Sequence, residues 1–238
     1  MSKVVHPFAH RLGTIRDWRH RWFAEGASYR ENLKTGVLLR EFLLKELRGM
    51  YVGGIELERN KSLRVVIKTS RPGLIIGRSG EGSTKLKNSI IAFLKRKKLP
   101  VPDLKLDIEE IRSPESSAPI VAYMVAEGLE KRLPFRRVLK QTIEKVMANR
   151  DVKGVRITLS GMLGGGSMAR TETLKKGRVP LQTIRADVEF HRERANLPLG
   201  VTGIKVWIYK GDIFANKRDT NPRIRANDTN KNSHEPIR

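Results

Sequence analysis

The chain has 238 residues, with 48 lysines and arginines against 25 aspartates and glutamates, and its formal net charge is +23 at pH 7. Such a surplus repels itself unless a polyanion neutralises it, and because the basic residues are spread along most of the chain, nucleic acid is favoured over an anionic membrane surface. The absence of cysteine excludes disulfides and thiolate metal sites, and no apolar run reaches the roughly 18–20 residues of a membrane span.

Residues 1–37 are interpreted as a basic arm in which aromatic residues are interleaved with arginines. The aromatic residues are Trp18, Trp22, Phe23 and Tyr29. They can stack on unpaired bases, but aromatic residues more often anchor an arm to the body of the protein, and we favour anchoring. Arg11 and Arg16 in this arm are candidate contacts to RNA.

Residues 38–112 have the pattern of a small α+β domain. Helical apolar spacing predicts a helix over about 37–47, alternation predicts a hairpin over 54–69, and a short helix, a glycine-rich loop, a second helix and a strand at 104–108 follow. The three strands are expected to form one sheet with helices on one face.

The glycine-rich stretch G-R-S-G-E-G-S-T at 77–84 suggests a phosphate-binding loop. Gly77 and Gly82 have the spacing of a P-loop, but Ser83 occupies the position of its lysine, so a nucleotide hydrolase is disfavoured. The run Gly77, Arg78, Ser79, Gly80 instead matches the G-x-x-G loop of a KH domain, which clamps an RNA backbone.

The physical chemistry of these residues suits that role. Glycines allow the backbone to approach phosphates closely, and the helix that follows presents unpaired N–H groups to an anion. Ile75 and Ile76 are expected to wall an apolar groove for bases. The helix-first order of elements indicates the type II arrangement of the KH domain.

Residues 113–212 predict a second domain, an α/β unit of two layers, and residues 213–238 a polar tail that is disordered in isolation. Helices are expected near 119–129 and 135–147, and strands near 154–160, 184–191 and 202–209. The glycine-rich segment 161–166, with Arg170, Arg178 and Arg185 nearby, is either a second RNA surface or a flexible connection with exposed arginines.

Several ordered segments carry a resemblance to a known family. They include K-V-V-H-P near the start, R-P-G-L-I-I-G-R-S-G-E at 71–81, S-G-M-L-G-G at 160–165, G-R-V-P-L at 177–181 and G-I-K-V-W-I-Y-K-G at 203–211. Over about residues 3–212 the chain resembles small-subunit ribosomal protein S3 of the bacterial type.

The resemblance implies a cytoplasmic structural component of the small ribosomal subunit, not a homo-oligomer, without a cofactor, metal or membrane partner. It implies binding to 16S-type rRNA in the head of the subunit, ribosomal proteins S10 and S14 as neighbours, and a place on the mRNA entry path with a part in unwinding mRNA. The family's entry-path positions fall here on Lys131, Arg132, Arg136, Arg137 and Lys140.

The residues themselves leave two interpretations of that basic cluster open. Arg136, Arg137 and Lys140 lie off the apolar stripe of their predicted helix, so they can reach phosphate or simply solvent. Lys131 and Arg132 can equally complement a helix C-terminus.

An enzyme is not expected. His6 and His10 have a helical metal-ligand spacing, but Pro7 lies between them and no third ligand is near. Glu109 and Glu110 are adjacent at a predicted strand end and point apart, which makes a poor acid–base pair.

Overall fold

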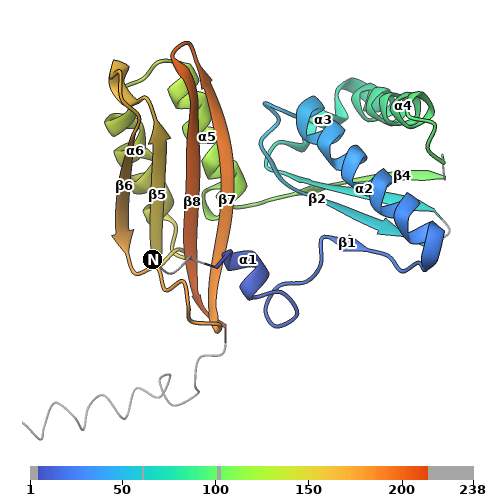
Figure 1. The fold of residues 1–238 in the computed structure, drawn as a ribbon, viewed down its shortest axis with the longest axis horizontal. Coiled ribbons are helices and arrows are strands. Elements are labelled where there is room, and N and C mark those ends of the chain that lie inside the picture. The colour runs from blue at the N-terminus through green and yellow to red at the C-terminus, as the bar shows by residue number, and fades with distance from the viewer. Residues whose placement is uncertain (1–4, 61, 101–102, 214–238) are drawn as a thin grey trace, which may run out of the picture.

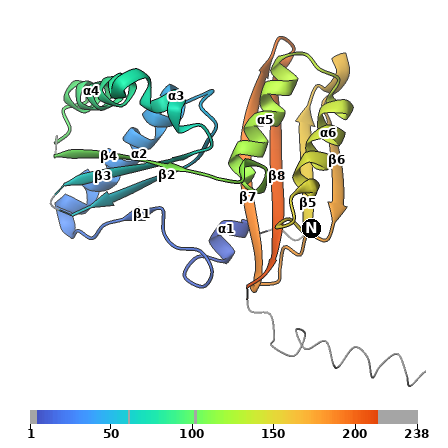
Figure 2. The same ribbon diagram turned by 180° about the vertical axis from the view of Figure 1, so that it is seen from behind.

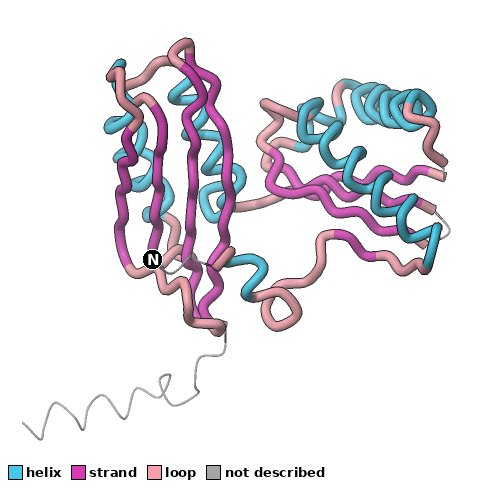
Figure 3. Tube along the Cα trace, in the orientation of Figure 1, coloured by secondary structure: helices cyan, strands magenta, loops and turns pink. Residues whose placement is uncertain are grey.

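The computed structural model describes residues 5–60, 62–100 and 103–213, so the tail predicted for 213–238 lies outside the described residues except for Ile213. Two domains lie side by side, each with a sheet covered by helices on one face (Figure 1). The tube in Figure 3 shows the same arrangement by secondary structure. The α+β class expected from the sequence is confirmed.

The first domain has the expected order of elements. They are α2 (Gly26–Glu46), β2 (Val52–Arg59), β3 (Leu63–Thr69), α3 (Pro72–Ile76), α4 (Glu81–Arg96) and β4 (Leu104–Glu110). β3 lies between β2, which is antiparallel to it, and β4, which is parallel to it. The boundary predicted between residues 37 and 38 falls inside α2.

The core of this domain is formed by residues with helical spacing in α4 and alternating residues in β3. Leu86, Ile90 and Leu94 recur every four residues on one side of α4, while Val65 and Ile67 alternate along β3, and all five are buried together. Among the described residues, no helix covers the other face of this sheet (Figure 1).

The arm supplies a strand that the sequence analysis missed. β1 (His20–Arg21) pairs in parallel with the edge strand β2, and Leu57 N–H donates to the Arg19 carbonyl, so the sheet has four strands rather than three. Its two residues are too few to produce a readable alternation. The arm therefore belongs in part to the sheet.

The second domain contains two helices and four strands. They are α5 (Ala118–Glu130), α6 (Phe135–Ala148), β5 (Gly154–Gly161), β6 (Arg170–Gly177), β7 (Ala186–Leu197) and β8 (Gly200–Asp212). The sheet order is β6-β5-β8-β7, antiparallel throughout. Figure 2 shows both helices on one face, and Figure 1 shows the opposite face.

β6 was not predicted, because its sequence R-T-E-T-L-K-K-G contains one large apolar residue, Leu174. That side chain packs against the core beneath α5 and α6, while most of the strand is exposed at the sheet edge. Edge strands of this kind commonly carry charge, which prevents pairing with other chains.

Candidate nucleic-acid interface

The G-x-x-G loop joins α3 to α4 in the conformation that its glycines permit. Gly77 has a φ of 70° and Gly80 a φ of 79°. Ser79 between them also adopts the left-handed region, with φ 51° and ψ 22°, which few non-glycine residues do. The loop thus exposes backbone at the N-terminal end of a sixteen-residue helix, whose first N–H groups favour an anion.

Gly82, which has the spacing of a P-loop glycine, is required here by helix packing and not by a nucleotide. A Cβ on Gly82 would lie 2.4 Å from the carbonyl oxygen of Ile75, so glycine is what allows α4 to cross α3 this closely. The hydroxyls of Ser83 and Thr84 donate to the Gly80 carbonyl oxygen over 2.8 and 3.2 Å. These three residues brace the loop.

The prediction that Ile75 and Ile76 wall an apolar groove is only partly correct. Ile75 is 3% exposed and belongs to the core, because it faces the sheet from the short helix α3. Ile76 and its neighbour Leu74 are the exposed apolar side chains before the loop. Arg78 is exposed and has no carboxylate partner within the described residues.

The turn between α5 and α6 is the second junction of interest. α5 ends where Lys131 and Arg132 donate backbone N–H bonds to the carbonyls of Glu127 and Leu129. Arg132 has a φ of 59°, at the position where helices usually place glycine. Arg132 therefore places a long cationic side chain at a backbone conformation that favours glycine.

Lys131 is held by an acidic neighbour on its own helix. Its Nζ donates to Glu127 over 2.6 Å, and the other oxygen of that carboxylate accepts from the Tyr51 hydroxyl over 2.6 Å. These two hydrogen bonds, that of Lys131 first, hold the pKa of Glu127 below its usual range. The sequence analysis did not identify this link between the two domains, since Tyr51 and Glu127 lie far apart along the chain.

The charges in the first turn of α6 oppose the dipole of that helix. Its first turn has no acidic residue, and Arg136 and Arg137 follow directly on Phe135. Cations near a helix N-terminus oppose the helix dipole. The alternative of a helix C-terminus complemented by cations thus remains open for Lys131 and Arg132 but does not explain these two arginines.

The cations of this turn are accessible. Arg136 makes one exposed ion pair at 3.4 Å with Glu172 on β6, and its guanidinium carbon lies 5.6 Å from the centroid of the Phe135 ring. Arg170 approaches the same ring at 5.5 Å. Within the described part of the chain, Arg137 and Lys140 are exposed and make no ion pair.

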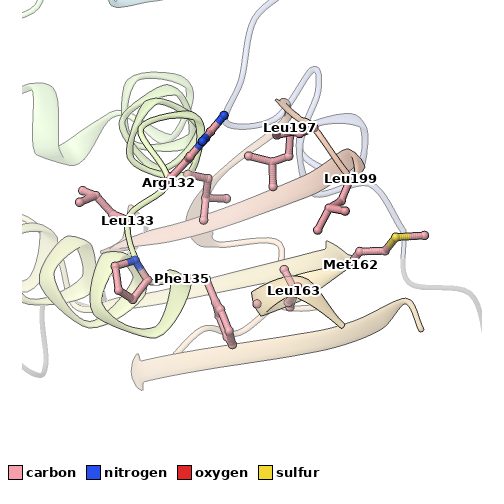
Figure 4. Close-up of a pocket in the computed structure, with 12 residues that line it drawn as sticks. Arg132, Leu133, Phe135, Met162, Leu163, Leu197 and Leu199 are labelled. Carbon is pink, nitrogen blue, oxygen red and sulfur yellow. The ribbon is translucent and has the colours of Figure 1, made fainter. Parts of the chain in front are cut away.

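An apolar pocket of about 560 Å³ lies beside this turn. Figure 4 shows Leu163, Leu197 and Leu199 gathered around it, with Arg132 on the rim. A wall of carbon atoms offers no partner to a phosphate, so any contact with a nucleic-acid backbone falls to the rim.

The prediction that Arg11 contacts RNA is wrong, because this residue is buried. Its side chain is 0% exposed, and its guanidinium donates to several backbone carbonyls, including those of Leu181 and Thr183 at 3.0 and 2.9 Å. Arg16 is paired with Asp187 and is partly buried. Both arginines attach the arm to the second domain, since a buried guanidinium requires such partners.

The aromatic residues do not supply the anchoring that we favoured for them. Trp18 is 61% exposed and Phe23 is 85% exposed, while Trp22 and Tyr29 lie against each other at 5.3 Å. The buried attachment is made by Arg11 instead.

Arg170, Arg178 and Arg185 do not gather around the segment 161–166. Arg170 pairs across from Gly161, but Gly177 lies across from Gly154 at the far end of the same strand pair. Arg178 therefore lies at the opposite end of the sheet. Arg185 is also away from the loop and is paired with Asp212 at 3.1 Å.

None of the described helices is long and apolar enough to cross a membrane. Across residues 5–60, 62–100 and 103–213 there is no group of three or more potential metal ligands among His, Cys, Asp and Glu side chains.

The fold and the loop together define an RNA-binding protein with a type II KH domain and a second domain of helices on an antiparallel sheet. Comparison with known proteins agrees. Residues 38–116 match the KH domain family, and residues 125–208 match the family "Ribosomal protein S3, C-terminal domain".

Curated relatives extend the match over nearly the whole chain. The small ribosomal subunit protein uS3 of Clostridium novyi (strain NT) is 39% identical over 219 residues, covering 92% of this chain and 96% of the relative. The uS3 protein of Clostridium botulinum (strain Okra / Type B1) is 37% identical over 228 residues, covering 95% and 100%. The chain belongs to the uS3 family of ribosomal proteins, and it is a cytoplasmic, RNA-binding protein of the small subunit rather than an enzyme.

Proposed function

We propose that the chain holds small-subunit rRNA through the G-x-x-G loop and contacts incoming mRNA through the turn between α5 and α6. The KH unit, taken as 38–112, would serve the first role, and the unit 113–212 the second. Ribosomal proteins S10 and S14 and the 16S-type rRNA of the head are the proposed neighbours.

The observation that carries the mRNA contact is the charge at the start of α6. Arg136 and Arg137 occupy a first turn where the helix dipole disfavours cations, and Arg132 occupies a position that favours glycine. Neither the helix dipole nor the backbone preference explains any of the three, and the one ion pair that they make among the described residues, Arg136 with Glu172, is exposed. Binding to a polyanion explains all of them, since phosphate contacts position a nucleic acid without reading its sequence.

The proposed clamp at the other junction rests on exposed backbone. Gly77 and Gly80 carry no side chain, and the N–H groups at the start of α4 face the same space. Arg78 adds a cation that no carboxylate of the described residues neutralises.

The test uses subunits that carry the double variant Arg136→Ala/Arg137→Ala. Translation of a message with a stable hairpin at the entry side should slow several-fold relative to an unstructured message of the same length. The matched control, Lys145→Ala/Arg150→Ala, removes two exposed cations from the other end of the same helix and its flank. Equal slowing of both messages, or equal effects of the two variants, would refute the mRNA contact.

A further inference from the structure

The sheet of the second domain has one face that neither α5 nor α6 covers (Figure 1). Successive residues of a strand point to opposite sides, so the register assigns side chains to this face in cross-strand rows. From β6 through β5 and β8 to β7, the rows are Lys175–Arg156–Trp207–Phe190, Thr173–Thr158–Lys205–Arg192 and Thr171–Ser160–Gly203–Arg194. Ile157 and Leu159, which alternate with them on β5, are buried in the core on the helix side. We call the face that carries the three rows the open C-terminal face.

The open C-terminal face carries cations without carboxylates. Its five charged residues are Arg156, Lys175, Arg192, Arg194 and Lys205, all basic, and among the described residues none of the five makes an ion pair. The glutamates of β6 and β7, Glu172, Glu189 and Glu193, alternate with the residues of the three rows and point the other way. Glu172, for example, meets Arg136 of α6.

The register also brings like charges together. Arg192 lies directly across from Lys205, and Lys175 lies directly across from Arg156. Like charges opposite each other destabilise a sheet. A bound anion that spans both pairs would reverse the sign of that contribution.

Most of these cations are accessible. Lys175, Arg192, Arg194 and Lys205 are exposed, and α1 (Pro7–His10) crosses only the lower end of β7 in Figure 1. Arg156 is half-buried, with its guanidinium carbon 5.0 Å from the centroid of the Trp207 ring. Its buried Nε has no hydrogen-bond partner within the described residues. The stacked indole holds this guanidinium in place before any partner arrives.

We propose that the open C-terminal face binds the sugar–phosphate backbone of double-stranded ribosomal RNA. This deepens the proposed function, because it rests on the binding of small-subunit rRNA and names a second surface and the form of RNA. Cations on neighbouring strands are about 4.8 Å apart, and those two residues apart on one strand about 6.7 Å, so several phosphates can be met at once.

The chemistry of the two rows that begin with Thr173 and Thr171 favours duplex RNA over an acidic protein segment. Thr171, Thr173 and Ser160 add hydroxyls that can reach 2′-OH groups, and the wide minor groove of A-form RNA is recognised through such contacts and through shape. Within the three rows the large apolar side chains are Trp207, which is buried, and Phe190, which is half-buried, so these rows expose little apolar surface that could anchor a protein.

The experiment measures binding of the full chain to 16S-type rRNA transcribed in vitro, at salt concentrations between about 50 and 200 mM. The variant Lys175→Ala/Arg192→Ala/Lys205→Ala should weaken binding roughly tenfold or more and lower the slope of log affinity against log salt by about 0.9 for each lost contact. Because the three side chains are exposed and unpaired in the described structure, the fold should persist, and circular dichroism checks this.

The matched control removes the same charge from the open face of the KH sheet. The variant Arg64→Ala/Lys68→Ala/Lys105→Ala should leave the salt slope unchanged. Arg78→Ala reports separately on the loop clamp. If only Arg78→Ala weakens binding, the open C-terminal face is excluded while the proposed function stands.

The other outcomes are equally decisive. If none of the variants changes binding, both the inference and the proposed rRNA clamp are wrong. Equal losses in the two triple variants would show a general charge effect and overturn the inference. An unchanged salt slope combined with poor incorporation into subunits would also overturn it, and would indicate a protein partner on this face.

Discussion

The two helix–turn–helix junctions of the molecule present their proposed RNA contacts in opposite ways. Between α3 and α4, Gly77 and Gly80 have no side chains, so the backbone itself can approach a phosphate at these positions. Between α5 and α6, Arg132 and Arg136 extend long side chains from a turn that lacks glycine. A backbone clamp is rigid and suits RNA that stays in place, whereas flexible cations suit a strand that must slide past.

Both junctions nevertheless place a non-glycine residue in the left-handed region. Ser79 has a φ of 51° and Arg132 a φ of 59°. Such conformations cost on the order of 1 kcal/mol, and an observed outlier points to a functional reason for it. The difference lies in what the side chain supplies, a short hydroxyl at one junction and a full positive charge at the other.

The largest effect is expected at the crossing that supports the KH loop. Gly82→Ala would place a Cβ 2.4 Å from the Ile75 carbonyl oxygen and 2.9 Å from that of Ile76, so α3 and α4 must separate. We expect a loss of about 2–3 kcal/mol in the free energy of unfolding, as in other overpacked sites, measured by urea denaturation of the full chain. Gly73→Ala is the control, since nothing lies within 4 Å of the added Cβ. Equal effects of the two variants would contradict the close crossing.

A paired substitution sharpens the comparison itself. Ser79→Gly and Arg132→Gly should each stabilise the chain by about 0.5–1 kcal/mol, because glycine removes the left-handed penalty. Their functions should diverge. Ser79→Gly should keep its affinity for rRNA, while Arg132→Gly should slow translation through a hairpin.

Urea denaturation, the rRNA-binding assay and the hairpin translation assay together measure the effects of these two substitutions. If Arg132→Gly were more stable and fully active, the left-handed arginine would have no role in contacting mRNA. If Ser79→Gly lost rRNA affinity, the hydroxyl rather than the backbone would carry the clamp.

The elements with strong apolar periodicity were predictable from the sequence. α4 and β3 bury every fourth and every second residue, and the G-x-x-G loop could be placed between them because its neighbours were readable. The family resemblance then indicated the turn at 131–140 as the proposed mRNA contact, which the charge pattern alone left ambiguous.

The rest depended on contacts between distant segments. β1 and β6 contain too few apolar residues to show alternation, and Arg11 meets carbonyls more than 160 positions away, which no local pattern encodes. The basic residues of the open C-terminal face did carry a signal. Arg192 and Arg194 alternate with Glu193 along β7, and this alternation predicts a basic face once the strand is known.

The smallest effect concerns the link between the domains. The lowered pKa of Glu127 means that the folded chain binds this proton more weakly than the unfolded chain does, so its contribution is present at neutral pH and is lost as pH falls below the ordinary glutamate range. The pair Glu127–Lys131 is exposed and four residues apart, so Glu127→Gln should cost only about 0.3–0.5 kcal/mol.

Urea unfolding of the wild type and Glu127→Gln at several values between about pH 3 and pH 7 checks this prediction. The difference between the two should be largest at pH 7 and should shrink toward acid pH. A difference that stays constant over this range would show that the carboxylate charge is not involved.

The division of labour between the two junctions is tested most directly by photo-crosslinking in assembled small subunits loaded with mRNA. A photoreactive residue replaces Ser79 in one preparation and Arg136 in another, and the crosslinked RNA is identified by sequencing. The account predicts rRNA at position 79 and mRNA at position 136. Crosslinks from position 136 to rRNA alone, with none to mRNA, would contradict it.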